Sequence, residues 1–183
     1  MLENGVSSYH RYLQGDDSAL EELVRSYSDT LVRFAYCFVR DSSAAEDVVQ
    51  DAFVSLVLKR RQFSDCDNFR AYLYKIVRNK CMDYLRFHKK RAPLQDAWNV
   101  ADGSSPEREA QRTERNKVLY HCLQTLPRQY SEVLYLVYFE EYTIERVGAI
   151  LKKTKKQVYN ALARAKLALK AALEKEGFSY EDL

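Results

Sequence analysis

Apolar residues recur along this chain at the three- and four-residue steps of an amphipathic helix. The clearest pattern lies between Thr143 and Lys170, where a short break separates two apolar stripes. The first stripe is made of Ile144, Val147, Ile150 and Leu151, and the second of Val158, Leu162, Ala165 and Leu169. Thr143 directly precedes the first stripe and is a residue type that caps helices. This spacing predicts two helices joined by a tight turn.

The outer face of the second helix carries cations, an aromatic ring and amides: Lys155, Lys156, Gln157, Tyr159, Asn160 and Arg164. A short helix, a tight turn and a longer helix with such a face form the helix-turn-helix plan, whose second helix can enter a DNA major groove. A plain helical hairpin with solvated lysines has the same pattern. Lys152 favours that alternative, because such turns usually hold a glycine in the left-handed conformation.

The same periodicity predicts the earlier helices. After a loose or short helical lead-in over residues 1–15, a long helix begins at Ser18, with Glu21 completing a capping box. A second helix opens with Ser43 and Glu46, and a third with Asn68 as its cap. Two more helices are predicted from Ser105-Pro106-Glu107 to Thr125 and after Leu126-Pro127.

Helix is expected throughout, since the 183 residues include only five Gly and three Pro. Periodicity is lost between residues 92 and 104, where Pro, Gly, Asp and Trp98 occur. We therefore expect an all-α chain of two small helical domains, residues 1–91 and 105–175, joined by a flexible linker at 92–104. The second domain ends in the helix-turn-helix, and residues 176–183 form an acidic tail.

Charge is distributed in blocks. Residues 1–58 carry 4 Lys/Arg against 10 Asp/Glu, whereas residues 59–91 carry 11 against 3 and residues 152–175 carry 8 against 1. Two separate basic blocks suit a protein that holds a polyanion at two places. In the first block, cations alternate with rings that could stack on unpaired bases: Phe63, Tyr72, Tyr74, Tyr84 and Phe87.

Several classes of protein are disfavoured. The cysteines at 37, 66, 81 and 122 are far apart, so neither a zinc site nor a disulfide framework is expected. With no phosphate loop, no metal-ligand spacing and no nucleophile beside a base, we expect no enzyme, cofactor, metal or small-molecule substrate. No leader and no run of eighteen apolar residues occur, so a cytoplasmic protein that is not inserted in a membrane is expected.

Three stretches resemble bacterial RNA polymerase sigma factors of the extracytoplasmic-function (ECF) group: SAAEDVVQDAFVSLV, NFRAYLYKIVRNKCMDYLR and LPRQYSEVLYLVYFEEYTIERVGAILKKTKKQVYNALARAKLAL. They cover nearly the whole chain in the family's order. The resemblance implies a region 2-like domain at 1–91 and a region 4-like domain at 105–175. It also implies that the chain binds core RNA polymerase and directs promoter recognition, DNA melting and transcription initiation.

The resemblance implies roles for individual residues. A face with Asp47, Gln50, Asp51 and Val54 would dock on the β′ clamp helices of the polymerase. The −10 promoter element would be bound by Phe63, Ser64, Asp65, Arg78, Asn79, Asp83 and Arg86. The −35 element would be bound by Thr154, Lys155, Lys156, Gln157, Tyr159, Asn160 and Arg164. The β flap and an anti-sigma factor are further implied partners.

The chain departs from the family pattern at some positions. Lys152 and Lys153 replace a usual glycine and aliphatic residue in the turn, and Gly148 replaces a helix-packing alanine. A stand-alone helix-turn-helix regulator remains the alternative. It would give no reason for an acidic docking helix, and binding to purified core polymerase would separate the two functions.

Overall fold

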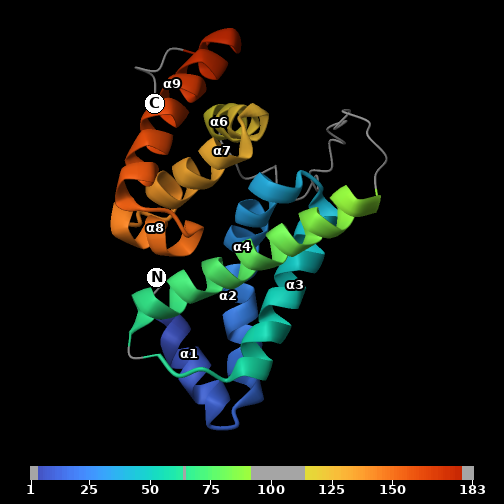
Figure 1. Cartoon of the computed structure of the whole chain (residues 1–183). Coiled ribbons are helices and arrows are strands. Elements are labelled where there is room, and N and C mark those ends of the chain that lie inside the picture. The colour runs from blue at the N-terminus through green and yellow to red at the C-terminus, as the bar shows by residue number, and fades with distance from the viewer. Residues whose placement is uncertain (1–3, 64, 92–113, 179–183) are drawn as a thin grey trace. The chain divides into compact units, whose positions relative to one another are not determined.

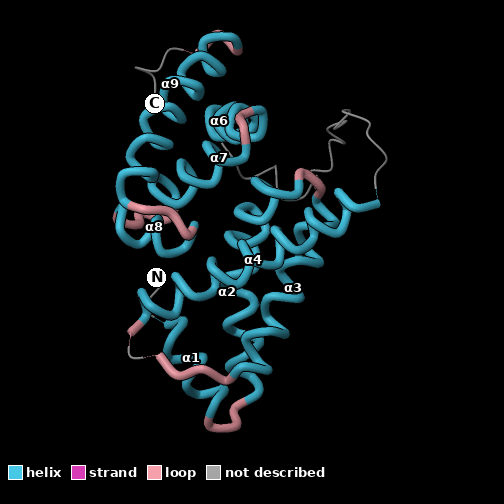
Figure 2. Tube along the Cα trace, viewed as in Figure 1, coloured by secondary structure: helices cyan, strands magenta, loops and turns pink. Residues whose placement is uncertain are grey.

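The computed structural model describes residues 4–63, 65–91 and 114–178. Within these ranges the chain contains helices and loops and no strand (Figure 2), which confirms the all-α prediction. The chain divides into two compact units, Met1–Asn99 and Val100–Leu183. Each unit has its own core and is described by itself.

The first unit contains α1 (Asn4–Leu13), α2 (Asp17–Val39), α3 (Ser42–Lys59) and α4 (Cys66–Arg91), shown in blue to green in Figure 1. Its core consists largely of the apolar faces that periodicity predicts, with Leu23, Leu31, Phe34, Leu56, Leu73 and Val77 almost fully buried. Burying a side chain of this size contributes about 1.5–3 kcal/mol, so these faces hold α2, α3 and α4 together.

The N-terminal segment is a full structural element of this unit. Tyr9 of α1 is completely buried and stacks on Phe69 of α4, with 5.0 Å between ring centroids. Gly5 lets α1 approach α2 closely, because a Cβ at this position would lie 2.1 Å from the Tyr27 hydroxyl. The expected loose lead-in is therefore a packed helix.

The helix starts differ from the predicted ones by one to three residues, because an upstream aspartate caps each helix. Asp16, and not Ser18, is the N-cap of α2, and Asp41, and not Ser43, is the N-cap of α3. At the start of α4 the backbone N–H of Asn68 donates to Asp65 at 2.7 Å, so Asn68 lies inside the helix. Asp and Ser are caps of similar strength, and the upstream residue adds helical hydrogen bonds.

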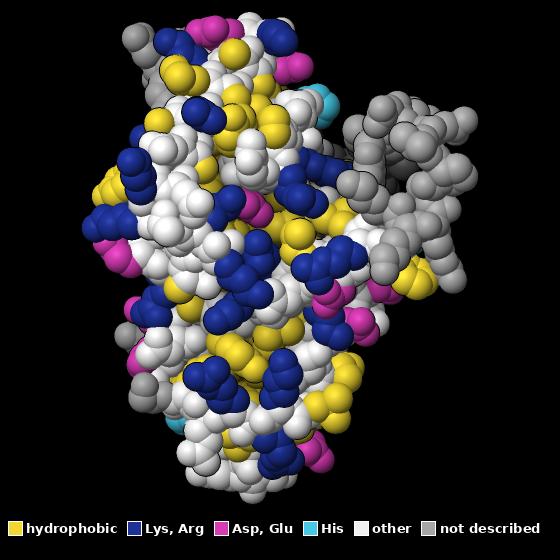
Figure 3. Space-filling model, viewed as in Figure 1, with side chains coloured by type: hydrophobic (Ala, Val, Ile, Leu, Met, Phe, Trp, Pro, Cys, Tyr) yellow, Lys and Arg dark blue, Asp and Glu magenta, His cyan; other side chains and the backbone are white. Residues whose placement is uncertain are grey.

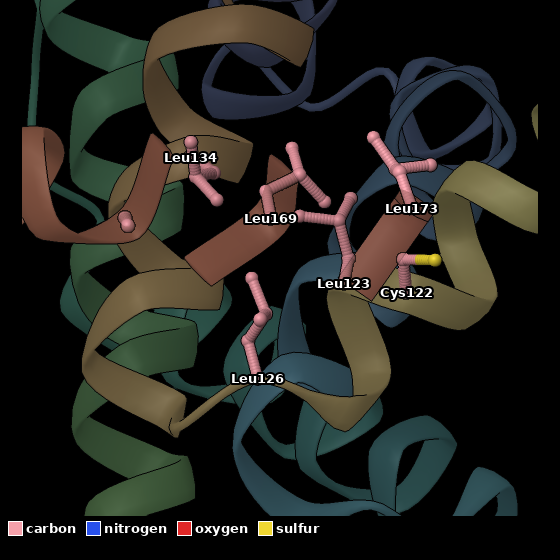
Figure 4. Packing of buried hydrophobic residues seen from close by; sticks show 7 residues of the cluster. Cys122, Leu123, Leu126, Leu134, Leu169 and Leu173 are labelled. Atoms are coloured by element: carbon pink, nitrogen blue, oxygen red, sulfur yellow. The ribbon is translucent and has the colours of Figure 1, made fainter. Parts of the chain in front are cut away.

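The second unit contains α6 (Glu114–Thr125), α7 (Arg128–Leu134), a π-helical turn η1 (Tyr135–Phe139), α8 (Ile144–Leu151) and α9 (Lys155–Lys175). Figure 4 shows how its core is built from three helices, with Cys122 and Leu123 of α6, Leu134 of α7, and Leu169 and Leu173 of α9. The predicted stripe on α9 is confirmed, since Val158, Ala165 and Leu169 are buried.

The π-helical turn was not predicted from the sequence. Its backbone closes with Glu140 N–H donating to the Tyr135 carbonyl at 3.2 Å, and the rings of Tyr135 and Phe139 stack at 5.3 Å. Rings at i and i+4 would share one face of a regular α-helix as well, so the spacing of Tyr135 and Phe139 gives no sign of the wider turn.

Some predicted features lie outside the described residues. These are Ser64, the linker at 92–104 with Trp98, the helix start at Ser105-Pro106-Glu107 and the end of the acidic tail.

Candidate polymerase and nucleic-acid interfaces

The expected docking face on α3 is exposed as a continuous stripe. Asp47, Gln50, Asp51 and Val54 all lie on the solvent side of the helix, opposite the buried Val48, Val49 and Phe53. Val54 is 55% exposed, and Leu58, one turn further along, is 76% exposed. An acidic stripe that ends in two exposed aliphatic side chains has the composition of an interaction surface.

One of these acids has an intramolecular partner. Lys80 of α4 lies 3.6 Å from the Asp51 carboxylate, and both side chains remain accessible to solvent. A partially exposed pair of this kind contributes at most about 1 kcal/mol. The Asp51 carboxylate can therefore exchange Lys80 for a cation of a partner at little cost.

Phe63 is placed differently from the expectation for a base-stacking residue. Its ring is only 9% exposed and packs against Tyr9, Phe69 and Tyr72, with centroid distances of 5.9, 5.5 and 5.0 Å. A base cannot stack on a ring that is covered by three others. Phe63 instead anchors the loop between α3 and α4 in the core, and Asp65 of this loop caps α4.

Most of the other rings expected to face bases are also covered. Tyr74 is completely buried and packs edge-on against Phe34 of α2 at 5.0 Å. Tyr72 lies beneath the guanidinium of Arg61, and Tyr84 packs on the ring of His88 at 4.1 Å. Phe87 alone among the five rings is highly exposed, at 52%. The aromatic character of this helix therefore serves the core more than the surface.

The polar row on α4 is accessible. Asn79, Asp83 and Arg86 follow one another at steps of four and three, with the half-buried Arg78 beside them. Asp83 and Arg86 form an exposed ion pair at 3.0 Å. Lys75, which the sequence analysis did not single out, extends the same row by one turn. Figure 3 shows Lys and Arg side chains gathered over α4 and the loop before it.

Sequence reasoning also missed Arg61, an exposed residue of this loop. Its guanidinium lies over the rings of Phe63 and Tyr72, with 5.7 and 5.3 Å to their centroids. The run Lys59-Arg60-Arg61 was a visible signal. The sequence could not reveal that the Arg61 guanidinium makes cation–π contacts with two rings.

The turn between α8 and α9 explains the departures from the family pattern. Lys152 has the left-handed conformation, with φ 55° and ψ 46°, that a glycine usually adopts at this position. The Lys153 ammonium lies 3.8 Å from the buried carboxylate of Glu132 on α7. Gly148 is required because a Cβ there would lie 2.7 Å from the Lys153 carbonyl oxygen.

The expected reading helix α9 presents its predicted polar face to solvent. Lys156, Tyr159, Asn160 and Arg164 are all exposed. Thr154 is the N-cap, and Gln157 completes a capping box by accepting the Thr154 N–H through Oε1 at 2.8 Å. Gln157 therefore supports the helix start with its oxygen, and its amide N–H groups are what it can offer a base edge.

Lys155 is engaged across the helix-turn-helix. Its ammonium donates to the Glu145 carboxylate of α8 at 2.5 Å. This hydrogen bond is the main reason why the pKa of Glu145 is lowered and that of Lys155 is raised. Both groups therefore stay charged through the physiological pH range, and a DNA phosphate that approaches Lys155 must compete with Glu145. The sequence did not indicate this pair, since the two residues lie on separate helices.

Within the described part of the chain, no three His, Cys, Asp or Glu side chains come together as a metal ion would require. No helix in the described ranges is long and apolar enough to span a bilayer.

Comparison with known proteins follows the division into two units. Residues 23–91 match the Sigma-70 region 2 family, and residues 116–169 match the family described as Sigma-70, region 4. The RNA polymerase sigma factor NccH of Alcaligenes xylosoxydans xylosoxydans is 30% identical over 171 residues, which are 90% of this chain and 91% of NccH. The ECF RNA polymerase sigma factor SigM of Bacillus subtilis is 26% identical, covering 83% of this chain and 93% of SigM.

Some relatives are longer, and some have known structures. The chain spans 41% of the probable RNA polymerase sigma factor RfaY of Xanthomonas campestris pv. campestris, with 27% identity. The solved structure of CnrH in complex with the cytosolic domain of CnrY has a TM-score of 0.63 and 25% identity, over 93% of this chain and 97% of that chain. Sigma factor RpoE of Bartonella quintana, solved with the anti-sigma factor NepR, has the same fold, with a TM-score of 0.61, 21% identity and coverage of 84% and 98%.

The two family matches coincide with the units that carry the cationic helices α4 and α9, in the order expected of a sigma factor. The chain therefore belongs to the sigma factors of bacterial RNA polymerase, which direct the core enzyme to promoters. Within that family it is a member of the ECF group, to which its relatives SigM and SigW of Bacillus subtilis also belong.

Proposed function

We propose that this sigma factor divides its work among three surfaces. The outer face of α3 binds the β′ clamp helices of core polymerase, α4 with the preceding loop binds and melts the −10 element, and α9 reads the −35 element while its unit contacts the β flap. The observation that carries the proposal is that each of the three helices buries one face in a core and leaves a charged face exposed.

The α3 face suits a protein partner rather than DNA. Its carboxylates at Asp47 and Asp51 would repel phosphates, whereas they attract the cations of a basic helix. Val54 and Leu58 add the apolar area that a stable protein interface requires. A stand-alone helix-turn-helix regulator would have no use for this face, so the alternative is not favoured.

The α4 and α9 faces suit DNA in two different states. On α9, Asn160 and Gln157 can hydrogen-bond base edges in a major groove, while Lys156 and Arg164 reach phosphates. On α4, the row from Lys75 to Arg86 offers donors along an extended surface, and Arg61 offers a cation above two rings for an unpaired base or its phosphate. The factor thereby acts by binding and not by catalysis.

An anti-sigma factor is a further proposed partner. Two structural neighbours, CnrH and RpoE of Bartonella quintana, were solved with CnrY and with the anti-sigma factor NepR. Regulation by such a partner would cover one or more of the three exposed faces until the factor is released.

The test uses holoenzyme assembled from core polymerase and the full chain, with promoter templates varied separately in the two elements. Asn79→Ala should reduce discrimination among −10 sequences and weaken permanganate reactivity of the melted region. Asn160→Ala should reduce discrimination among −35 sequences, by roughly 1–3 kcal/mol against the best site. Arg25→Ala, which removes an exposed cation from α2, is the matched control and should change neither preference.

The proposal requires each variant to change the preference at one promoter element and not at the other. If Asn79→Ala alters −35 preference, or if Asn160→Ala leaves −35 preference unchanged, the assignment of the two helices is wrong.

A further inference from the structure

Hydrogen bonds join the loop between α3 and α4 to α1. His10 of α1 makes a hydrogen bond between its Nε2 and the backbone carbonyl oxygen of Phe63, at 2.8 Å. A carbonyl oxygen can only accept, so Nε2 carries the hydrogen and donates it. Fifty-three positions separate the two residues, and the contact fixes the backbone at Phe63, two positions before Asp65, the residue that caps α4.

A second contact fixes the other end of the same loop. Arg60, which directly follows α3 and has φ 43°, donates from Nη2 to the carbonyl oxygen of Leu13 at 3.2 Å. Its guanidinium also lies over the ring of Tyr12, 5.7 Å from the centroid. Arg60 is therefore hydrogen-bonded to the backbone of α1, and Phe63 to a side chain of α1.

Between these two contacts, Tyr9 supports the loop from the core. Its ring lies between Phe63 and Phe69, at centroid distances of 5.9 and 5.0 Å, and is completely buried. The rings leave little room for the Phe63 backbone to move without breaking the His10 hydrogen bond. Residues 4–13 also lie outside the stretch, 23–91, that matches the region 2 family.

We infer that α1 is a specificity element for −10 recognition, and that His10 is its positioning residue. His10 does not touch DNA in this assignment. It holds residues 60–63 in the conformation in which Arg61 and the start of α4 meet the melted strand. The inference rests on the proposed role of this loop and α4 in binding the −10 element.

The test separates positioning from plain packing with two substitutions of similar size. His10→Gln keeps an N–H donor at a comparable reach, whereas His10→Leu keeps the volume and removes the donor. In holoenzyme, His10→Leu should lower discrimination among −10 sequences and the rate of open-complex formation by about three- to ten-fold, the range that one hydrogen bond supports. His10→Gln should restore most of the loss. Core affinity and −35 preference should stay unchanged in both.

Matched controls and a second variant keep the result interpretable. His121→Leu replaces an exposed histidine of the other unit and should leave −10 preference unaltered. Arg60→Met removes the hydrogen bond to the Leu13 carbonyl oxygen and should also reduce −10 discrimination. This variant tests the role of α1 independently if His10→Leu folds poorly. A pure loss of a phosphate contact at Arg60 would instead lower the salt slope by about one and leave the preference intact.

The outcomes distinguish this inference from the function on which it rests. If Asn79→Ala loses −10 discrimination while His10→Leu and Arg60→Met retain it, α1 has no positioning role. If His10→Gln is as defective as His10→Leu, the donor is not the cause and the inference is overturned. If Asn79→Ala itself retains −10 discrimination, the proposed function of α4 has failed, and the inference fails with it.

Discussion

At the scale of single residues, Phe63 has a role that its position in a loop does not suggest. Because three rings surround it, Phe63→Ala should destabilise the first unit by about 3–5 kcal/mol, the usual cost of truncating a buried phenylalanine. Phe87→Ala is the matched control, since Phe87 is 52% exposed, and it should cost less than about 1 kcal/mol. Thermal and denaturant unfolding of the full chain measure both.

The same pair of variants tests whether Phe63 contacts a base directly. The packing predicts that most of the open-complex defect of Phe63→Ala follows the unfolded fraction and recovers on cooling. Because the ring also supports Arg61, the folded variant should keep a smaller defect, no larger than that of His10→Leu. A Phe63→Ala protein with normal stability and a melting defect well beyond that of His10→Leu would restore the direct stacking role that the sequence suggested.

Lys152 provides a second prediction at this scale. A side chain in the left-handed conformation costs about 1–2 kcal/mol relative to glycine, part of which glycine loses again through its greater freedom in the unfolded chain. Lys152→Gly should therefore stabilise the second unit by roughly 1 kcal/mol. Lys152→Ala removes the charge and keeps the strain, so it should be nearly neutral. Equal stability of the Gly and Ala variants would mean that the φ of 55° is not a source of strain.

At the scale of elements, α8 and α9 are tied by the ion pair between Glu145 and Lys155. The lowered pKa of Glu145 keeps its carboxylate charged, so it competes with DNA phosphate for the Lys155 ammonium. Glu145→Gln should strengthen binding of holoenzyme to all promoters alike, by a few-fold. It should also make the negative slope of log affinity against log salt steeper, by up to about one. Lys155→Ala should have the opposite effect on both quantities, and promoter titrations at several salt concentrations measure them.

A double variant identifies how Glu145 acts. If it acts by occupying Lys155, the gain from Glu145→Gln should disappear when Lys155 is already alanine. A gain of the same size in the Lys155→Ala background would show that Glu145 repels DNA through its own charge.

Helical periodicity predicts these elements well where burial depends only on local spacing. The inward faces of α2, α3 and α9 followed from steps of three and four, as with Leu23 and Leu31. The caps were harder to predict, because Asp16 and Ser18 are equally good candidates by residue type. Asp16 is the cap because its backbone is extended and its side chain accepts from the Ala19 N–H, which the sequence does not show.

At the scale of the whole molecule, helical periodicity and the low Gly and Pro content predicted the all-helical class and the exposed faces of α3 and α9, and the resemblance predicted the family. The surface of α4 was predicted less well. Tyr74 lies at the edge of the apolar face, and its burial depends on Phe34 of another helix. The contact of His10 with Phe63 spans 53 positions, so no local pattern could have indicated it.

Assembly with core polymerase provides the last prediction. Asp47 is the first residue of the α3 stripe and is exposed, so its replacement should disturb no core contact. Asp47→Lys places a like charge against a basic partner helix and should weaken core affinity about ten-fold or more. Asp51→Asn is preferable to Asp51→Lys, because a lysine there would face Lys80.

Glu21→Lys is the matched control for this prediction. It makes the same change of charge on an exposed position of α2, so the overall charge changes equally while the α3 face stays intact. Titration of labelled core enzyme should show normal affinity for Glu21→Lys and weak affinity for Asp47→Lys at low salt, with the difference shrinking as salt screens the repulsion. The two variants binding core equally well would place the polymerase interface elsewhere on the chain. A difference that persisted at high salt would mean that apolar contacts of Val54 and Leu58, rather than charge, dominate docking.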